Sequence, residues 1–418
     1  MSASAIATGA GPSVRDEWRR GYKVVVSAHV GMATGAGLYF YASSLFVIPL
    51  SETFGWSRGD IALGTALGLL GSLTAPLIGR LTDRFGARIV AGLCAIIAGA
   101  VFAVMSQMTG PFAQYVALSA VFGLVAPGVM AMTFSRAVTG WFKRARGQAL
   151  GVMAAGNSIG ALLFTPVIAF MLAQYGPEGG YLTLTALTAL LGGPVILAGL
   201  RERDGISHED GGVEERDADA PADRGRIFAT LRSRSFIALA LAVFATNVPV
   251  AGVLTQLEPL LLHNGVTQTA PLVSMYAIVV LLGRLGVGWL FDRTDARYVA
   301  AGVTILAATG CLLFLSGAPA WGVIAAIVLV GLMQGMEVDA IGYFVARQFG
   351  RGEFGLIFGI LLTASLLGTA IGILGFGMLY DATQSYDLAL MLAAGVIAIA
   401  FVGYLAIPRT GEQAANDT

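Results

Sequence analysis

Three charged residues interrupt apolar stretches that are otherwise long enough to cross a bilayer. Arg284 lies in the stretch 270–291, and Glu337 and Asp339 lie in the stretch 320–346. A charged side chain at the centre of a bilayer costs about 2.5–3.5 kcal/mol or more, so it needs a partner, a cavity or a function. A guanidinium stays ionised and presents a two-pronged donor to a carboxylate. We therefore expect Arg284 to bind an anionic solute, the alternative being a structural ion pair with an acid on another helix.

The two acids suit the exchange of a proton. They are two residues apart, so on a helix they point about 200° apart and only one of them faces a given cavity. Asp339 precedes Arg347 by about eight residues, as Arg284 precedes Asp292, which places both about 12 Å from the same side of the bilayer. We expect either Glu337 or Asp339 to take a proton when the substrate neutralises Arg284. The alternative is a fixed ion pair that never titrates.

Six further polar residues lie within the apolar stretches. His29 is in the first stretch, and the ordinary titration of histidine near pH 6.5 suits proton exchange. The other five are candidates for contact with the substrate, because buried phenols and amides must find partners: they are Tyr39, Tyr41, Asn157, Asn247 and Gln334. For all six, the alternative is a hydrogen bond that joins one helix to another.

The composition requires lipid around these residues. Hydrophobic residues make up 56% of the 418 residues and charged residues only 12%, whereas soluble domains are about 25% charged. Glycine, with 56 residues, is about twice as frequent as usual, and small residues let membrane helices approach closely. We therefore expect a lipid bilayer as the surroundings of the chain.

Several classes of function are excluded by what the sequence lacks. The formal net charge is zero, which argues against a nucleic-acid partner. No phosphate-binding loop of the ATP-driven kind is present. The only histidines are His29, His208 and His263, so no metal cluster is expected, and Cys94 and Cys311 are too far apart for a metal-binding pair. We predict no cofactor and no metal, and we do not expect an enzyme.

Twelve stretches have the length of about 20 mostly apolar residues that a membrane helix needs. A polar start without the pattern of a cleaved signal precedes the first of them, so we expect that stretch to be retained. The expected spans are 23–50, 60–82, 88–108, 112–138, 147–173, 180–200, 235–262, 270–291, 298–317, 320–346, 354–378 and 385–407.

An acidic, Gly- and Pro-containing segment divides the spans into two sets of six. Its composition is that of a solvated linker rather than of a core. The expected organisation is a tail 1–22, a bundle 23–200, a linker 201–234, a second bundle 235–407 and a tail 408–418.

The basic residues fix the expected orientation. With a cytoplasmic N-terminus, Arg58 is the only basic residue in the outer loops, while the inner loops and tails hold many. Because positively charged loops stay in the cytoplasm, both termini should be cytoplasmic. We expect a multi-pass protein of a bacterial inner membrane that acts as a monomer.

The two halves share a repeated motif after their second spans. Gly79-Arg-Leu-Thr-Asp83-Arg84-Phe-Gly-Ala-Arg88 in the first half matches Gly288-Trp-Leu-Phe-Asp292-Arg293-Thr-Asp-Ala-Arg297 in the second, with Gly, Asp-Arg and Ala-Arg at identical spacing. Duplicated halves of this kind are known from secondary transporters.

The motif resembles the signature loop of the major facilitator superfamily, which the first copy matches fully and the second matches except at Asp295. The resemblance implies an all-α fold of twelve membrane helices in two pseudo-symmetric six-helix bundles, working by alternating access. It also implies a conformational latch that stabilises the outward-open state. The latch residues would be Gly79, Asp83, Arg84, Arg88, Asp292 and Arg293. The Asp83 carboxylate would accept hydrogen bonds at a neighbouring helix start; for the arginines, the alternative is positive-inside placement alone.

A narrower resemblance points to the monocarboxylate and oxalate/formate exchanger group. It rests on Phe54 to Arg58, on Trp141-Phe142 with Arg146-Gly147, and on Gly283-Arg284. In that group an arginine at the position of Arg284 binds the substrate carboxylate. The chain departs from the group at Val280, where animal members have Asp, and in the span 354–378, which lacks the lysine of the oxalate/formate exchanger.

Together these observations predict a secondary transporter that moves a small organic anion, a monocarboxylate because only one fixed cation is expected in the cavity, together with a proton. The two alternatives within transport are exchange of one carboxylate for another and proton-coupled export of a lipophilic drug. A receptor or scaffold would need a larger soluble part than the linker and tails provide.

Overall fold

The computed structural model describes residues 13–68, 71–142, 144–202, 230–349 and 354–408. Within these ranges the chain is helical and contains no strand, which confirms the all-α prediction. Most of the predicted tails and most of the predicted linker lie outside the described residues, and so do the side chains of Asp292 and Asp339.

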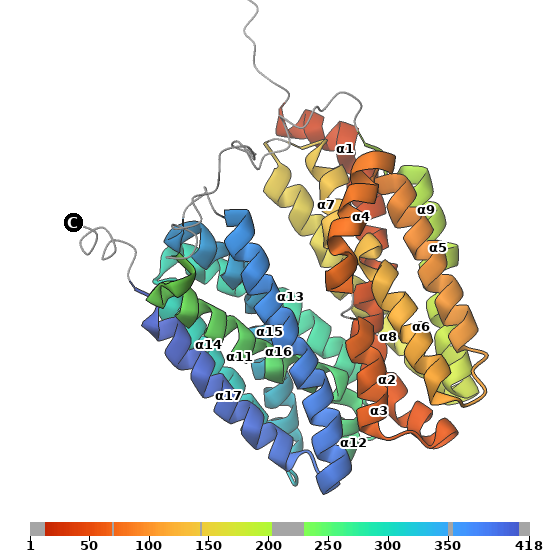
Figure 1. Cartoon of the computed structure of the whole chain (residues 1–418), viewed down its shortest axis with the longest axis vertical. Coiled ribbons are helices and arrows are strands. Elements are labelled where there is room, and N and C mark those ends of the chain that lie inside the picture. Colours follow the sequence, from red (N-terminus) through yellow and green to blue (C-terminus); the bar gives the residue numbers. More distant parts are fainter. Residues whose placement is uncertain (1–12, 69–70, 143, 203–229, 350–353, 409–418) are drawn as a thin grey trace, which may run out of the picture.

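The described part of the first half contains nine α-helices, and Figure 1 shows them packed together. They are α1 (Val14–Thr34), α2 (Ala36–Phe54), α3 (Arg58–Leu67), α4 (Gly71–Phe85), α5 (Ala87–Met105), α6 (Phe112–Val125), α7 (Ala131–Thr139), α8 (Arg146–Thr185) and α9 (Gly193–Gly199). The second half consists of α11 (Arg234–Thr255), α12 (Leu257–His263), α13 (Ala270–Arg293), α14 (Ala296–Leu313), α15 (Ala320–Gln348), α16 (Phe354–Thr383) and α17 (Asp387–Ala406).

Several expected spans are built from two consecutive helices. The first span is interrupted at Gly35, between α1 and α2, and the fourth at a 3₁₀ turn that contains Pro127. Proline has no N–H to donate and clashes with the preceding turn, so a break at Pro127 is expected. The proline of α2, Pro49, is accommodated within the helix. Such interruptions let side chains of one span point in different directions above and below the break.

The fifth and sixth spans are joined without a loop. Among the described residues, ten stretches are long and apolar enough to cross a membrane. The longest, Arg146–Gly199, has 54 residues. It contains one non-helical residue, Gly176, with φ 62°. A methyl group at Gly180 would lie 2.6 Å from a Leu172 methyl carbon, although residues eight apart on a straight helix are about 12 Å apart. The chain therefore turns back at Gly176, and this stretch makes two crossings.

The first helix begins earlier than expected, at Val14 rather than near residue 23. Ser13 caps its start by accepting from the Asp16 N–H, and the Asp16 side chain accepts from Ser13 in return. Such a capping box starts a helix regardless of hydropathy. An apolar-run criterion therefore misses this polar first part.

The halves meet at one end of the molecule. We name the end at which α1 begins the inner end, following the expected orientation, and the opposite end the outer end. Across the halves, α3 packs against α16, α2 packs against α11 and α12, and α8 packs against α13. The ribbons of the two halves lie together at the outer end and diverge toward the inner end (Figure 1).

Candidate substrate and proton site

Arg284 lies where α13 and α15 are in direct backbone contact. A methyl group at Gly335 of α15 would lie 2.5 Å from the Val280 carbonyl oxygen and 2.7 Å from the Arg284 nitrogen. Only glycine permits this approach, and Glu337 follows two residues later on the same helix. The half-buried Arg284 and Glu337 are consequently close enough for their charges to interact.

Glu337 is held by polar groups of two other helices. The Ser365 hydroxyl of α16 donates to its carboxylate at 3.1 Å, and the Asn247 side chain of α11 is a second neighbour. Asn247 is itself fixed, since its amide group donates to the Val243 carbonyl at 2.8 Å and its oxygen accepts from Thr369 at 3.2 Å. Side chains of α11, α13, α15 and α16 thus converge on one carboxylate.

Tyr41 brings the first half to this cluster. It is only 5% exposed, and its hydroxyl neighbours Ser158 of α8 and the charges of Arg284 and Glu337. Tyr276 of α13 is buried within range of the charge of Glu337. We call Arg284, Glu337, Asn247, Tyr41 and Tyr276 the central cluster. Since its members come from both halves, relative movement of the halves changes its geometry.

Two predicted amides present an oxygen without a protein partner. The Asn157 side-chain oxygen and the Gln334 side-chain oxygen are buried and accept no hydrogen bond from any described residue. Asn157 lies directly against Gly37 of α2, where an added methyl group would overlap its oxygen. A buried acceptor without a partner costs about 1–3 kcal/mol. Such atoms are suited to a hydroxyl or amide donor on a bound molecule.

Two other predicted residues lie apart from the central cluster. Tyr39 packs within the first half, with its ring 5.3 Å from that of Phe102 and 5.0 Å from that of Phe122. His29 is tied to α8 through a 2.7 Å contact of its Nδ1 with the Val152 carbonyl. The contacts of both residues join one helix to another.

Asp83 of the predicted latch contacts residues of its own half. Asp83, at the inner end of α4, forms an ion pair with Arg136 at the end of α7. We expected Asp83 to accept from the N–H groups of a neighbouring helix start. That position is occupied by Glu202, which accepts from the Ala87 N–H at 2.7 Å and lies 3.6 Å from the Arg136 Nε. Asp83 and Glu202 therefore share one guanidinium.

The arginines of the repeated motif behave differently from one another. Arg84 and Arg88 are exposed, and Arg84 lies over the neighbouring Phe85 ring at 5.2 Å. In the second copy, Arg293 lies over the Trp289 ring at 4.1 Å. A methyl group added at Gly79 would meet no described atom within 4 Å outside the neighbouring helix backbone. These positions suit an aromatic and headgroup environment at a membrane interface.

An extensive contact at the outer end was missed from the sequence. The Asp381 carboxylate of α16 accepts from the backbone N–H of Arg58 at 3.0 Å and of Gly59 at 2.6 Å, at the start of α3. The Arg58 guanidinium lies 3.4 Å from the centre of the Tyr380 ring and donates to the Tyr386 hydroxyl. This outer contact joins the two halves, and no sequence spacing connects its partners.

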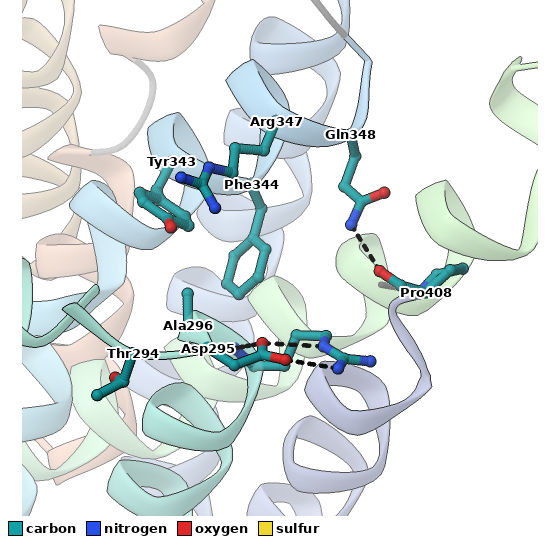
Figure 2. Close-up of a pocket in the computed structure, with 9 residues that line it drawn as sticks. Thr294, Asp295, Ala296, Tyr343, Phe344, Arg347, Gln348 and Pro408 are labelled. Atoms are coloured by element: carbon teal, nitrogen blue, oxygen red, sulfur yellow. Dashed lines mark hydrogen bonds and ion pairs between the residues drawn. The ribbon is translucent and has the colours of Figure 1, made fainter. Parts of the chain in front are cut away.

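A cavity of about 340 Å³ at the inner end of the second half is a weaker candidate site (Figure 2). It lies between the start of α14 and the end of α15. Its Arg297 is neutralised by Asp295 at 2.6 Å and donates to the Ile407 carbonyl. The cavity contains none of the predicted substrate or proton residues, so the central cluster remains the candidate site.

Comparison with family models decides the identity of the fold. The model of the Major Facilitator Superfamily matches residues 29–372, with a further match over 236–418. The chain belongs to the Major Facilitator Superfamily.

Members of the superfamily with known names cover nearly the same length. An uncharacterized MFS-type transporter, YcxA, of Bacillus subtilis is 23% identical over 409 residues, covering 92% of this chain and 95% of the relative. Monocarboxylate transporter 11 of Homo sapiens is 26% identical over 387 residues, covering 86% and 77%. The Fujikurins efflux protein of Gibberella fujikuroi is 24% identical over 341 residues, covering 78% and 68%.

Solved structures of the superfamily share the fold. The inward-open xylose transporter XylE from E. coli superposes with a TM-score of 0.71 at 14% identity, covering 93% of this chain and 96% of that one. The nucleoside transporter NupG superposes with a TM-score of 0.68 at 14% identity, covering 92% and 98%. The chain is therefore a multi-pass membrane transporter of small molecules with the twelve-helix superfamily fold, and it is not an enzyme.

Proposed function

We propose that this transporter moves a small monocarboxylate together with one proton across a bacterial inner membrane by alternating access. The observation that carries the proposal is the central cluster, in which Arg284 of α13 and Glu337 of α15 lie within range of each other's charge and Tyr41 reaches them from the first half. A carboxylate at Arg284 would form charge-assisted hydrogen bonds that a neutral solute cannot form. The single fixed cation of the central cluster favours one carboxylate over two.

The substrate is held by groups of both halves. Arg284 binds the carboxylate, and Tyr41 closes the site from the first half. Asn157 and Gln334, with their unpartnered oxygens, accept from a hydroxyl or N–H group elsewhere on the solute. Monocarboxylate transporter 11 among the relatives supports the same substrate class.

The proton is carried by Glu337. In the proposed empty carrier, an ionised Glu337 carboxylate is attracted by the charge of Arg284. A substrate carboxylate at Arg284 offsets this attraction and adds a negative charge nearby, so Glu337 takes up a proton. Substrate and proton then bind and leave together. Asp339, the second acid of this helix, is the other candidate for this role.

Alternating access follows from the contacts at the two ends. The outer contact through Asp381 and Arg58 closes the outer end, so we assign this arrangement to the inward-facing state. The inner end faces the cytoplasm because the basic loop residues gather there. In the outward-open state, release of Arg136 would free Asp83 of the latch to act at the other half.

Two other functions have specific support. Exchange of one carboxylate for another is the alternative in which the carrier does not return empty, because the charge of Arg284 hinders its movement without a bound anion. Proton-coupled export of a lipophilic compound is supported by the Fujikurins efflux protein among the relatives. The central cluster favours an anion over a neutral lipophilic compound, because Arg284 is costly to desolvate without a counter-charge.

The first experiment is uptake of a panel of radiolabelled solutes into proteoliposomes. Monocarboxylates should accumulate, and neither dicarboxylates nor lipophilic cations should. Arg284→Ala should abolish uptake, and Arg284→Lys should reduce it at least tenfold, because lysine keeps the charge but loses the two-pronged donor.

The control is Arg80→Lys, which makes the same change at an exposed arginine of α4 that does not belong to the central cluster. Uptake of monocarboxylates at the wild-type rate by both Arg284 variants would overturn the proposal. Export of a lipophilic compound with no monocarboxylate uptake would establish the competing function.

A further inference from the structure

A groove opens between α11 and α17 on the inner half of the second bundle, well away from the central cluster. It has a volume of about 720 Å³ and is lined mainly by apolar side chains. Ile237 and Leu241 form one wall, and Ile399 and Val402 form the other. These four side chains are exposed, so the groove opens outward from the bundle.

Small residues of α17 line the bottom of the groove and allow α17 to approach α11 closely. Ala398, Gly403 and Ala406 line α17 along the groove. A methyl group at Gly403 would lie 2.8 Å from the Ala238 carbonyl oxygen of α11, so the two backbones are in contact there. The lining residues of α17 extend over about two helical turns, or about 12 Å. The groove therefore has the shape of a channel along the helix axes rather than a round pocket.

Two arginines stand at one mouth of the groove. Arg232 and Arg234 flank Ser233, the residue that caps the start of α11, and both line the groove. Both side chains are exposed, and neither forms an ion pair with any residue that the structure describes. Two positive charges above an apolar channel match a molecule with an anionic head and an apolar tail.

We propose that this groove binds an anionic phospholipid of the cytoplasmic leaflet, with its phosphate at Arg232 and Arg234 and one acyl chain along α11 and α17. Basic pockets between membrane helices on the cytoplasmic side are suited to anionic headgroups. The orientation used here is that of the proposed function, whereas lipid binding itself is independent of the transported substrate.

The test is native mass spectrometry of the detergent-purified chain titrated with phosphatidylglycerol or with phosphatidylcholine. The wild-type chain should bind phosphatidylglycerol with a clear preference over the zwitterionic lipid. Each arginine near an anionic lipid surface is worth about 1 kcal/mol, or about fivefold in binding. Arg232→Gln with Arg234→Gln should therefore lower this preference by about 30-fold.

The matched control is Arg19→Gln with Arg20→Gln. These two arginines are equally exposed at the same end of the molecule, but they border no such groove among the described pockets. This variant should keep the wild-type preference. A second variant, Ala398→Phe, fills the groove while leaving both arginines in place. It should weaken the binding of phosphatidylglycerol, and inorganic phosphate should not displace the lipid from either protein.

Three results would overturn the proposal. One is equal binding of phosphatidylglycerol and phosphatidylcholine by the wild-type chain. Another is unchanged preference in the double arginine variant. The third is displacement of phosphatidylglycerol by millimolar inorganic phosphate, which would show that the arginines bind phosphate without the groove. Loss of transport with lipid binding intact would count against the proposed function alone, so the two failures are distinguishable.

Discussion

In the proposed mechanism, a single carboxyl group of the central cluster determines whether transport is coupled to proton movement. Glu337 accepts from Ser365 at 3.1 Å and lies near Arg284. A glutamine at this position keeps the size and the ability to accept from Ser365 but cannot gain or lose a proton. The residue therefore separates proton coupling from substrate binding.

We expect Glu337→Gln to abolish net proton-driven uptake and to retain exchange of internal for external monocarboxylate. In exchange the carrier moves only in its loaded form, in which Glu337 is proposed to be protonated and thus resembles glutamine. The measurement compares pH-gradient-driven uptake with counterflow in the same proteoliposomes. Full gradient-driven uptake by this variant would assign the proton to another group, with Asp339 the next to test.

The two copies of the repeated motif differ at one position for a backbone reason. Gly86 has φ 83°, in the left-handed region that side chains disfavour. Its counterpart Asp295 has φ −69°, caps α14 by accepting from the Arg297 N–H, and pairs with the Arg297 side chain. The second copy thus starts its helix with a side-chain cap where the first copy uses a glycine turn.

We expect Gly86→Ala to destabilise the protein by about 1–2 kcal/mol, since a left-handed backbone costs a side-chain-bearing residue about that much. Gly79→Ala should be neutral, because nothing lies within 4 Å of a methyl group there. Thermal unfolding in detergent, followed by size-exclusion chromatography, measures both. Equal melting temperatures for the two variants would contradict the role of the Gly86 backbone.

At the scale of whole helices, the outer contact joins the start of α3 to the end of α16. A carboxylate at a helix N-terminus is stabilised by the exposed N–H groups and by the helix dipole. Asp381 supplies this carboxylate from the opposite half, while Asp60 caps the same helix from within it, through Ser57. Only the first of the two interactions depends on how the halves are arranged.

We expect Asp381→Asn to shift the population toward the outward-open arrangement by about 1–3 kcal/mol, the usual worth of hydrogen bonds to a charged group. Spin labels on the outer ends of α3 and α16 would report longer distances. Asp60→Asn is the matched control and should leave the distance distribution unchanged. A distribution in Asp381→Asn that equals the wild type would show that the outer contact does not hold this state.

Helices that cross the membrane were predictable from hydropathy, whereas their partners across the halves were not. Continuous apolar runs predicted α5, α13 and α17 within a few residues. The early start of α1 depends on a polar capping box, and the turn at Gly176 depends on a single backbone conformation. The Asp381 contact with Gly59 joins residues 322 apart, and no local pattern encodes such a pairing.

The predicted site residues differ in where the structure places them, for a similar physical reason. The cost of burying charge singled out Arg284 and Glu337, and the structure brings them together. Hydrogen-bonding capacity alone could not separate Tyr41, which lies at the central cluster, from Tyr39, which packs among aromatic rings. Neighbouring tyrosines on one helix point in different directions, and the packing partners decide their roles.

At the scale of the whole molecule, the proposed stoichiometry fixes the electrical behaviour of transport. One monocarboxylate and one proton carry no net charge together. We therefore expect uptake to respond to a pH gradient and to be insensitive to the membrane potential. Proteoliposomes clamped with valinomycin and potassium measure this directly. An uptake rate that changes several-fold between clamped potentials would contradict the one-to-one stoichiometry.

The direct contact of α13 and α15 at Gly335 has a consequence for how the carrier evolves and can be engineered. Because no side chain separates the two backbones, we expect these helices to move as one rigid unit. Arg284 and Glu337 would then keep a constant separation throughout the proposed cycle. In the proposed mechanism, the second half both binds the substrate and couples its transport to the proton. The first half moves relative to it and closes the site. A chimaera that takes its first half from a distant relative should therefore keep the proton coupling of this protein.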